Sequence, residues 1–309
     1  MKFLAAFVLK GRTQAVVVTV VMAILALLLP PFSYLSGAVV ALVTLRYGIR
    51  AGLQLSLLAS IAAALLLLSM QLPPQLGGAF MLVLWLPVWV LATSLRRTAS
   101  QARVVLLAAL FGMMVLVGLL WALDDPAEWW LGVLRKLMEP MLTQLPTEDL
   151  SQVEAELVLL AAQMSGVMAA ALMASLIACL LLGRWWQSLL FNPGGFGEEF
   201  RQIRLGRTMA GAVLLIVVVH LLGQLADGLD GLPRDLLALG QVAFALQGLS
   251  VVHGLAQGRN LHRGWLIGLY VLLLVVTGPL VLLLAMLGLL DSWFDFRGKF
   301  GRGTTTESN

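Results

Sequence analysis

The sequence predicts an all-α protein, a polytopic bundle of transmembrane helices with seven to nine spans. Apolar residues make up 60% of the 309 residues and charged residues only 12%, whereas a soluble domain carries about 25% charged residues. Mean hydropathy is +0.95. No stretch alternates as a β-strand does, and a bilayer admits only helices or closed barrels. Soluble, disordered and nucleic-acid-binding classes are excluded, and the lipid bilayer is the first expected partner.

Charge-free apolar runs near the roughly 20 residues that a spanning helix needs define the expected spans. These runs cover residues 13–29, 51–70, 79–95, 104–123, 157–183, 208–226, 236–256 and 264–290. A shorter run, 33–45, follows Pro30 and Pro31 and is either a short span or the return arm of a re-entrant hairpin. We expect one integral membrane domain over residues 1–290 and a polar C-terminal tail over 291–309. The first run has no clear cleavage site, which favours a retained span over a signal peptide.

The distribution of Lys and Arg predicts the orientation of the chain. With the N-terminus in the cytoplasm, the inner segments hold most of the basic residues, and the segment 124–156 outside is rich in Asp and Glu. Lys and Arg concentrate on the cytoplasmic side of multi-pass proteins. The C-terminal tail disagrees with this orientation. An odd number of spans places the tail outside, yet it carries Arg297, Lys299 and Arg302.

The outer segment 124–156 is expected to be a helical insertion. Asp125 followed by Pro126 is a helix-start signal, and Ser151 with Glu154 matches a capping box for the next helix. An amphipathic stripe lies between them, at Trp130, Leu134, Leu137 and Met141. The sequence therefore predicts a short amphipathic helix on the outer membrane surface, either a structural brace or a gate over a cavity.

Uncharged polar side chains are sparse within the expected spans, and no charged residue falls inside one. Proton- and ion-driven pumps usually keep ionisable groups in the membrane, so a carboxylate relay is not expected. The candidate substrate-binding residues are Gln163, His220, Gln224, Asp227, Gln241 and Gln247. They either line a small-solute pocket open to the outside or hydrogen-bond one another between helices.

Enzyme and metal motifs are missing from the sequence. There is no HExxH, no GxSxG, no Walker motif and no Cys/His metal spacing. The single cysteine, Cys179, lies in an apolar run and is expected to be a buried small residue. We therefore expect no enzymatic activity, no cofactor and no metal site.

Residues 191–207, FNPGGFGEEFRQIRLGR, form a polar segment between two apolar runs on the predicted cytoplasmic side. Pro193 and the glycines after it signal a turn, and the glutamates and missing Lys-Ser/Thr pair argue against a phosphate loop. The residues that follow predict a short cytoplasmic interfacial helix. Its expected surface for anionic lipid or for a partner protein consists of Phe196, Phe200, Arg201 and Arg204.

Four polar segments together carry a family resemblance. They are NPGG at 192–195, FRQIRLG at 200–206, QGLSVVH at 247–253 and GLLDSWFDFR at 288–297. In these segments the chain resembles the YybS-like family of bacterial polytopic membrane proteins, which is distantly similar in layout to the substrate-binding components of energy-coupling-factor transporters. The resemblance implies residence in the bacterial cytoplasmic (inner) membrane and capture of a small solute, with a partner ATPase supplying energy.

Two functional hypotheses remain open. The first is a solute-binding or transport-related membrane protein, based on the polar groups in the spans and on the resemblance. The second is a non-transporting scaffold or assembly factor for cell-envelope or membrane-biogenesis proteins. It is based on the absence of charge within the spans and on pairs of small residues at helical spacing, Ala170 with Ala174 and Gly254 with Gly258.

Overall fold

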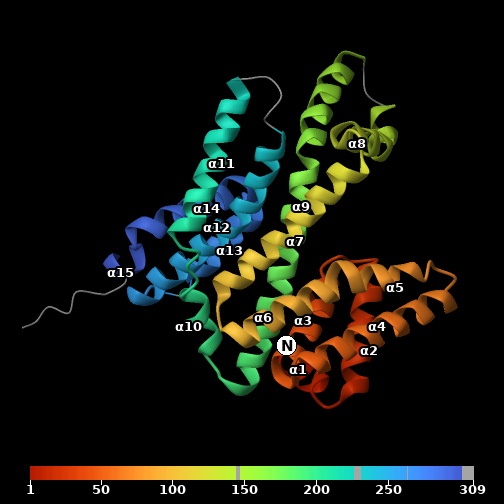
Figure 1. Cartoon of the computed structure of the whole chain (residues 1–309), viewed down its shortest axis with the longest axis vertical. Helices are drawn as coiled ribbons and strands as arrows, with labels where there is room; N and C mark the ends of the chain where they lie inside the picture. The colour runs from red at the N-terminus through yellow and green to blue at the C-terminus, as the bar shows by residue number, and fades with distance from the viewer. Residues whose placement is uncertain (144–146, 226–230, 263, 301–309) are drawn as a thin grey trace, which may run out of the picture. The chain divides into compact units, whose positions relative to one another are not determined.

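The computed structural model of the chain describes residues 1–143, 147–225, 231–262 and 264–300. Every regular element in these ranges is a helix (Figure 1). Within the described ranges, seven helical segments are long and apolar enough to cross a membrane, and three apolar helices are shorter. The predicted all-α polytopic bundle is therefore confirmed. The described chain divides into two compact units, unit 1 with residues 1–108 and 174–204, and unit 2 with residues 109–173 and 205–309.

Unit 1 is built around one short helix that is buried on all sides. Its elements are α1 (Lys2–Val8), α2 (Arg12–Ala26), α3 (Phe32–Tyr47), α4 (Ile49–Ser69), α5 (Gln75–Phe80), the π-helical turn η1 (Met81–Trp85), α6 (Leu86–Thr98), the start of α7 (Gln101–Ala122), the end of α9 (Thr147–Phe191) and α10 (Gly195–Arg201). Residues 36–45 of α3 are all buried. A helix that is apolar all round belongs in an interior, so α3 forms the core of this unit.

Helices α2 and α3 run antiparallel, as both alternatives for residues 33–45 require, and both are among the shorter apolar helices. Ser36 Oγ donates to the Thr19 carbonyl at 2.8 Å, and Tyr47 Oη donates to the Leu9 carbonyl at 2.8 Å. Residue numbers thus rise along α3 as they fall along α2. Trp85 is fully buried and donates its Nε1–H to Ser36 Oγ at 2.9 Å, so this hydroxyl joins α2, α3 and η1.

The end of α9 packs on α3 through small residues. A Cβ at Gly37 would lie 2.9 Å from the Cβ of Cys179, and a Cβ at Gly183 would lie 2.8 Å from the Ala38 carbonyl oxygen. Cys179 is fully buried, as the sequence predicts. The small residues let the two helix backbones approach closely, which in a membrane is a principal source of helix association.

Unit 2 contains the remaining parts of α7 and α9 with α8 (Pro126–Leu142), α11 (Arg207–Leu225), α12 (Gly231–Gly258), α13 (Gly264–Val275), α14 (Thr277–Phe294) and α15 (Phe296–Phe300). The expected single span over 264–290 is wrong, because the helix breaks at Val276 into α13 and α14. Pro279 lies in the first turn of α14, where the missing N–H costs nothing. Pro279, which interrupts the apolar run, was the sequence signal for this break.

Helices α12 and α14 run parallel and in close contact. A Cβ added to Gly248 would collide with the Leu284 carbonyl, and one added to Gly288 would collide with the Phe244 carbonyl and lie 2.6 Å from the Gly248 nitrogen. This reciprocal pattern places Gly288 opposite Gly248. Farther on, Arg297 lies against Gly254. Residue numbers therefore rise together along both helices, and the end of α14 lies level with the end of α12.

Helix α8 is the predicted insertion helix, and it packs on α9. Asp125 Oδ1 accepts from Ala127 N at 2.9 Å and from Glu128 N at 3.0 Å, which confirms the predicted cap. Its buried side is not the whole predicted stripe: Trp130 and Leu134 pack against α9, whereas Leu137 and Met141 are exposed.

The expected capping box at Ser151 is wrong, since α9 already begins at Thr147. Glu154 instead accepts hydrogen bonds from Arg135, with the Nη2 to Oε2 distance at 2.7 Å. This hydrogen bond, and then the charge of Glu154, raise the pKa of the Arg135 guanidinium.

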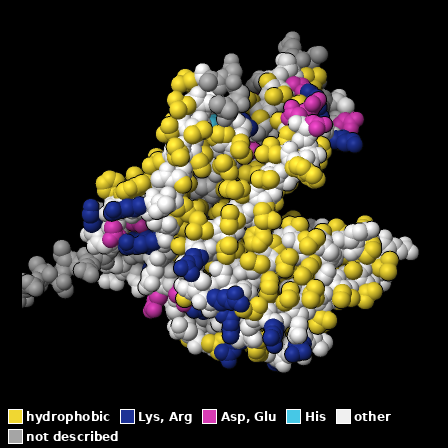
Figure 2. Space-filling model, viewed as in Figure 1, with side chains coloured by type: hydrophobic (Ala, Val, Ile, Leu, Met, Phe, Trp, Pro, Cys, Tyr) yellow, Lys and Arg dark blue, Asp and Glu magenta, His cyan; other side chains and the backbone are white. Residues whose placement is uncertain are grey.

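Each unit presents a segregated surface in Figure 2. On the visible face of unit 1, Lys and Arg side chains gather along one border, and hydrophobic side chains cover most of the rest. In unit 2, Asp and Glu gather around α8. Broad exposed apolar surface is expected where lipid covers the protein, and many large apolar side chains on α4, α11, α13 and α14 are exposed.

Candidate functional site

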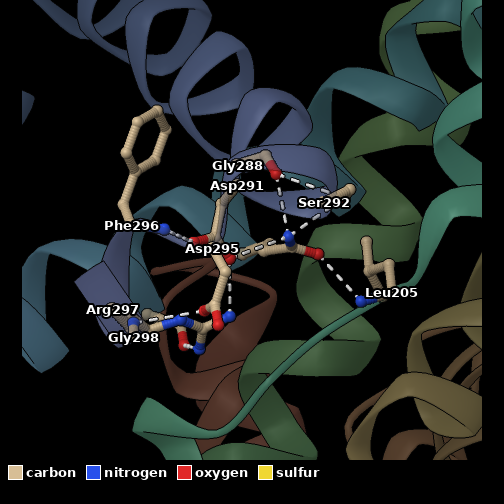
Figure 3. Close-up of polar contacts among 10 residues, drawn as sticks. Leu205, Gly288, Asp291, Ser292, Asp295, Phe296, Arg297 and Gly298 are labelled. Carbon is tan, nitrogen blue, oxygen red and sulfur yellow. Dashed lines mark hydrogen bonds and ion pairs between the residues drawn. The ribbon is translucent and has the colours of Figure 1, made fainter.

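A buried polar cluster joins α12, α14, α15 and the segment before α11 (Figure 3). Its centre is Gln247, which is fully buried on α12. The Gln247 Nε2 donates to the Gly288 carbonyl at 2.8 Å and to Ser292 Oγ at 3.2 Å. Its Oε1 accepts from the Leu205 backbone N–H at 2.8 Å. One amide side chain thus ties three chain segments together.

A buried ion pair lies beside this glutamine. The Asp291 side chain is 0% exposed and the Arg297 side chain 9% exposed, and Arg297 Nη2 lies 2.7 Å from Asp291 Oδ2. Asp291 Oδ1 also accepts from the Phe296 N–H at 3.0 Å, and Arg297 Nη1 donates to the buried Ser250 Oγ at 3.1 Å. A charge removed from water is tolerated when it is paired and hydrogen-bonded, and both conditions hold here.

Local sequence explains why Arg297 can reach this position. Asp295 adopts a left-handed conformation with φ of +46° and ends α14, and its Oδ1 accepts from the Gly298 N–H at 3.2 Å. The chain therefore turns back at this residue into α15. Together with the close approach of Gly248 and Gly288, this turn brings Arg297 alongside Ser250 on α12.

Three of the four segments that carry the family resemblance meet at this cluster. Leu205 belongs to FRQIRLG, Gln247 and Ser250 belong to QGLSVVH, and the ion pair belongs to GLLDSWFDFR. These stretches are far apart in sequence but share hydrogen bonds in the fold. The motifs are therefore explained in structural terms, as the contacts that fix α14 and α15 onto α12.

The structure brings together only one pair of the described residues among the six candidate substrate-binding residues. Gln163 is exposed on α9 and donates to the Leu159 carbonyl of its own helix at 3.2 Å. His220 Nε2 and Gln224 Nε2 lie 3.1 Å apart on α11, and this is the only pair of the set that hydrogen bonds join within the described ranges. Gln241 is half-buried on α12. Asp227 lies outside the described residues, and Gln247 is committed to the cluster above.

Charged residues that sequence reasoning missed lie at the other end of α12. This helix begins at Gly231, before the expected 236, and therefore includes Arg234 and the buried Asp235. The expected span 236–256 itself contains no charged residue, but the helix that includes it does. Pro233 in the first turn was the available signal, because proline is favoured at helix starts.

This second cluster joins α12 and α8 to α9. The Arg234 Nη2 donates to the Ala162 carbonyl, and a Cβ at Gly166 would lie 2.7 Å from Asp235 Oδ1. Trp130 of α8 donates from Nε1 to Ser165 Oγ at 3.1 Å. Arg234 and Trp130 thus hydrogen-bond their helices to α9, whereas the buried Asp235 Oδ1 has no hydrogen-bond partner among the described residues.

Helix α10 confirms the predicted short helix after the Pro-Gly turn. Arg184 of α9 forms a two-point ion pair with Glu199, with Nε to Oε2 at 2.9 Å. Ser188 Oγ accepts from the Phe196 N–H at 3.1 Å. These contacts fix α10 to the end of α9.

The predicted α10 surface is partly buried. Phe200 is buried, Phe196 and Arg201 are half-buried, and Arg204 is exposed. Beside them lies a groove of about 280 Å³, lined among others by Ser100, Gln101, Glu199, Gln202 and Arg204. The available part of the surface is thus polar, while the phenylalanines mainly anchor the helix.

The described residues include no group of three or more His, Cys, Asp or Glu side chains arranged to hold a metal ion. No curated protein and no solved structure matches the chain. The sequence profile of one family, described as "Predicted membrane protein (DUF2232)", matches residues 17–292. The match covers most of the chain, including the polar cluster up to Ser292. The chain is therefore a multi-pass membrane protein that belongs to the DUF2232 family of predicted membrane proteins.

Proposed function

We propose that this protein is a non-transporting assembly factor of the bacterial inner membrane, with its N-terminus in the cytoplasm. Its partner is a membrane protein with an acidic cytoplasmic segment, which binds at α10 and the adjoining groove. The observation that carries the proposal is that the buried polar side chains of the main cluster hydrogen-bond to neighbouring helices. Gln247, Asp291 and Arg297 are all occupied in joining helices, as expected for a rigid helical support.

The surface at α10 is suited to an acidic segment. Glu199, the acidic residue among the described lining residues of the groove, is paired with Arg184, and the basic Arg204 on the same lining is exposed. Ser100, Gln101 and Gln202 add hydrogen-bonding side chains for a peptide backbone. Charge complementarity at such a rim mainly sets partner choice and association rate.

Site-specific crosslinking tests this function. A photo-crosslinking amino acid replaces the exposed Gln202 in the full-length chain, and native membranes are irradiated. We expect a discrete adduct whose partner peptide is acidic, and we expect Arg204→Glu to abolish it. Lys2→Glu, at an exposed residue far along the chain from the groove, is the matched charge-reversal control.

A compensating exchange makes this test decisive. Reversing the acidic residues of the crosslinked partner segment to Lys should restore the adduct with Arg204→Glu. The proposal fails if a normally accumulated chain gives no adduct from position 202, or if the adduct is indifferent to the charge at position 204.

A second candidate, capture of a small polar solute in the manner of an energy-coupling-factor substrate-binding component, is favoured by His220. The His220 Nδ1 is buried and has no hydrogen-bond partner among the described residues, while its Nε2 faces Gln224. A polar ligand would satisfy that nitrogen. In a thermal-shift screen of vitamins, nucleobases and metal ions, this candidate requires a compound that stabilises the wild type but not Gln224→Leu.

A further inference from the structure

We propose that a groove in unit 1 binds one anionic phospholipid, with the phosphate at a basic rim and an acyl chain along an apolar floor. The groove has a volume of about 340 Å³ and lies between the end of α1 and helices α2, α3 and α4. Its size falls in the range of small-molecule sites, about 300–1,000 Å³. The proposal is independent of the partner surface at α10.

The rim of the groove is basic. Lys10 and Arg12 both line it and are both exposed, and no acidic residue is among its described lining residues. The Tyr47 hydroxyl donates to the Leu9 carbonyl at 2.8 Å. This bond anchors the short connection between α1 and α2 that carries Lys10, and it therefore holds the basic residues at a fixed place.

The floor of the groove is apolar and comes from two other helices as well as α2. Val16 of α2, Val43 of α3 and Leu58 of α4 contribute to it, and Leu58 is 50% exposed. An inorganic anion would use the rim alone. A phospholipid has both a negative headgroup and an apolar chain, so the two halves of the groove together specify a lipid.

Figure 2 shows one face of the unit to which the lining residues of the groove belong. Lys and Arg gather along one border of unit 1, next to a broad hydrophobic face. Such a boundary between basic and apolar surface is where a lipid headgroup meets its acyl chains. Anionic lipids attract basic residues that lie at the membrane surface.

Native mass spectrometry of the purified full-length protein in detergent tests the charge requirement. Each basic residue near a membrane surface contributes about five-fold to the affinity for anionic lipid. We therefore expect phosphatidylglycerol to bind in preference to phosphatidylcholine. Lys10→Ala with Arg12→Ala should weaken phosphatidylglycerol binding about 25-fold.

The double variant Arg97→Ala with Arg103→Ala removes two exposed basic side chains outside the groove and should leave binding unchanged. Equal binding of the two lipids, or an unchanged affinity of the Lys10/Arg12 variant, would overturn the proposal. Competition by millimolar inorganic phosphate as effective as that by the lipid would identify a simple anion site instead, and would also overturn it.

Two tryptophan substitutions test the apolar floor. Leu58→Trp fills the groove, whereas Leu57→Trp makes the same change at a neighbouring exposed position that does not line it. We expect Leu58→Trp to reduce phosphatidylglycerol binding at least about five-fold and Leu57→Trp to have no effect. Equal effects of the two variants would refute an acyl chain in the groove, even if the basic rim were confirmed.

Discussion

Replacing Arg297 with Met is expected to destabilise the protein strongly, because it leaves a carboxylate buried without its partner. Asp291 is fully buried at its side chain, and Arg297 Nη2 lies 2.7 Å from its Oδ2. The other hydrogen bonds of this carboxylate are retained, from the Phe296 N–H to Oδ1 and from Gln247 Nε2 to Oδ2 at 3.4 Å. Removal of one member of a buried pair typically costs about 3–5 kcal/mol.

A double-mutant cycle measures how much of this loss in the free energy of unfolding comes from the pairing of Asp291 with Arg297. Asp291→Asn alone keeps an acceptor for the Phe296 N–H but leaves the guanidinium unpaired, so we also expect a loss of about 3 kcal/mol. The double variant has neither charge, and a neutral replacement of a buried pair is often tolerated. We expect it to lose about 1–2 kcal/mol, so that the coupling free energy exceeds about 2 kcal/mol.

Unfolding in mixed micelles of dodecylmaltoside and sodium dodecyl sulfate, followed by tryptophan fluorescence, measures these differences. Lys299→Met is the matched control, since Lys299 is exposed on the same short helix, and its effect should stay within about 0.5 kcal/mol. If Arg297→Met resembled this control, or if the double variant lost the sum of the single losses, the ion pair would not hold α14 and α15 in place.

The remaining predictions concern α12 and α14. Gly288→Leu should prevent the approach of the two helices and cost several kcal/mol in the same assay, whereas Gly278→Leu, with open space around it, should be nearly neutral. In a Cys179→Ala background, single cysteines at Gln257 and Lys299 should react with a membrane-impermeant maleimide from the same side of the membrane. Labelling from opposite sides would refute the parallel register of α12 and α14.

Local signals in the sequence predicted local structure well. Asp125 with Pro126 marked the start of α8, and the Pro-Gly turn marked the start of α10, because capping and turn conformations depend on a few adjacent residues. The spacing of apolar residues did less well on α8. It identified the helix but not which side faces α9, since Leu137 is exposed and the docking direction depends on the neighbouring helix.

The buried clusters could not be predicted because their partners are distant in sequence. Gln247 was identified as a polar residue in a span, but its contacts with Leu205 and Gly288 follow from the packing of α12. Asp291 lies directly after the last apolar run, so the sequence alone placed it in a tail. Its true position, at the end of α14 and fully buried, requires knowledge that Arg297 folds back to neutralise it.

The break at Val276 also removes the exception in the charge distribution. A single span over 264–290 placed the tail opposite to the loop after α12, although Arg297 and Lys299 are basic. Helix α13 has 12 residues and spans about 18 Å, too short to cross a bilayer core of about 30 Å alone.

The Tyr270 hydroxyl lies 3.2 Å from His253 Nε2, so α13 returns along α12, and α14 then runs parallel to α12. Arg297 and Lys299 consequently lie on the side where α12 ends, which is also the side of the next residue, Arg259. With the cytoplasmic N-terminus that we propose, that side is the cytoplasm, and the tail obeys the rule that favours Lys and Arg there.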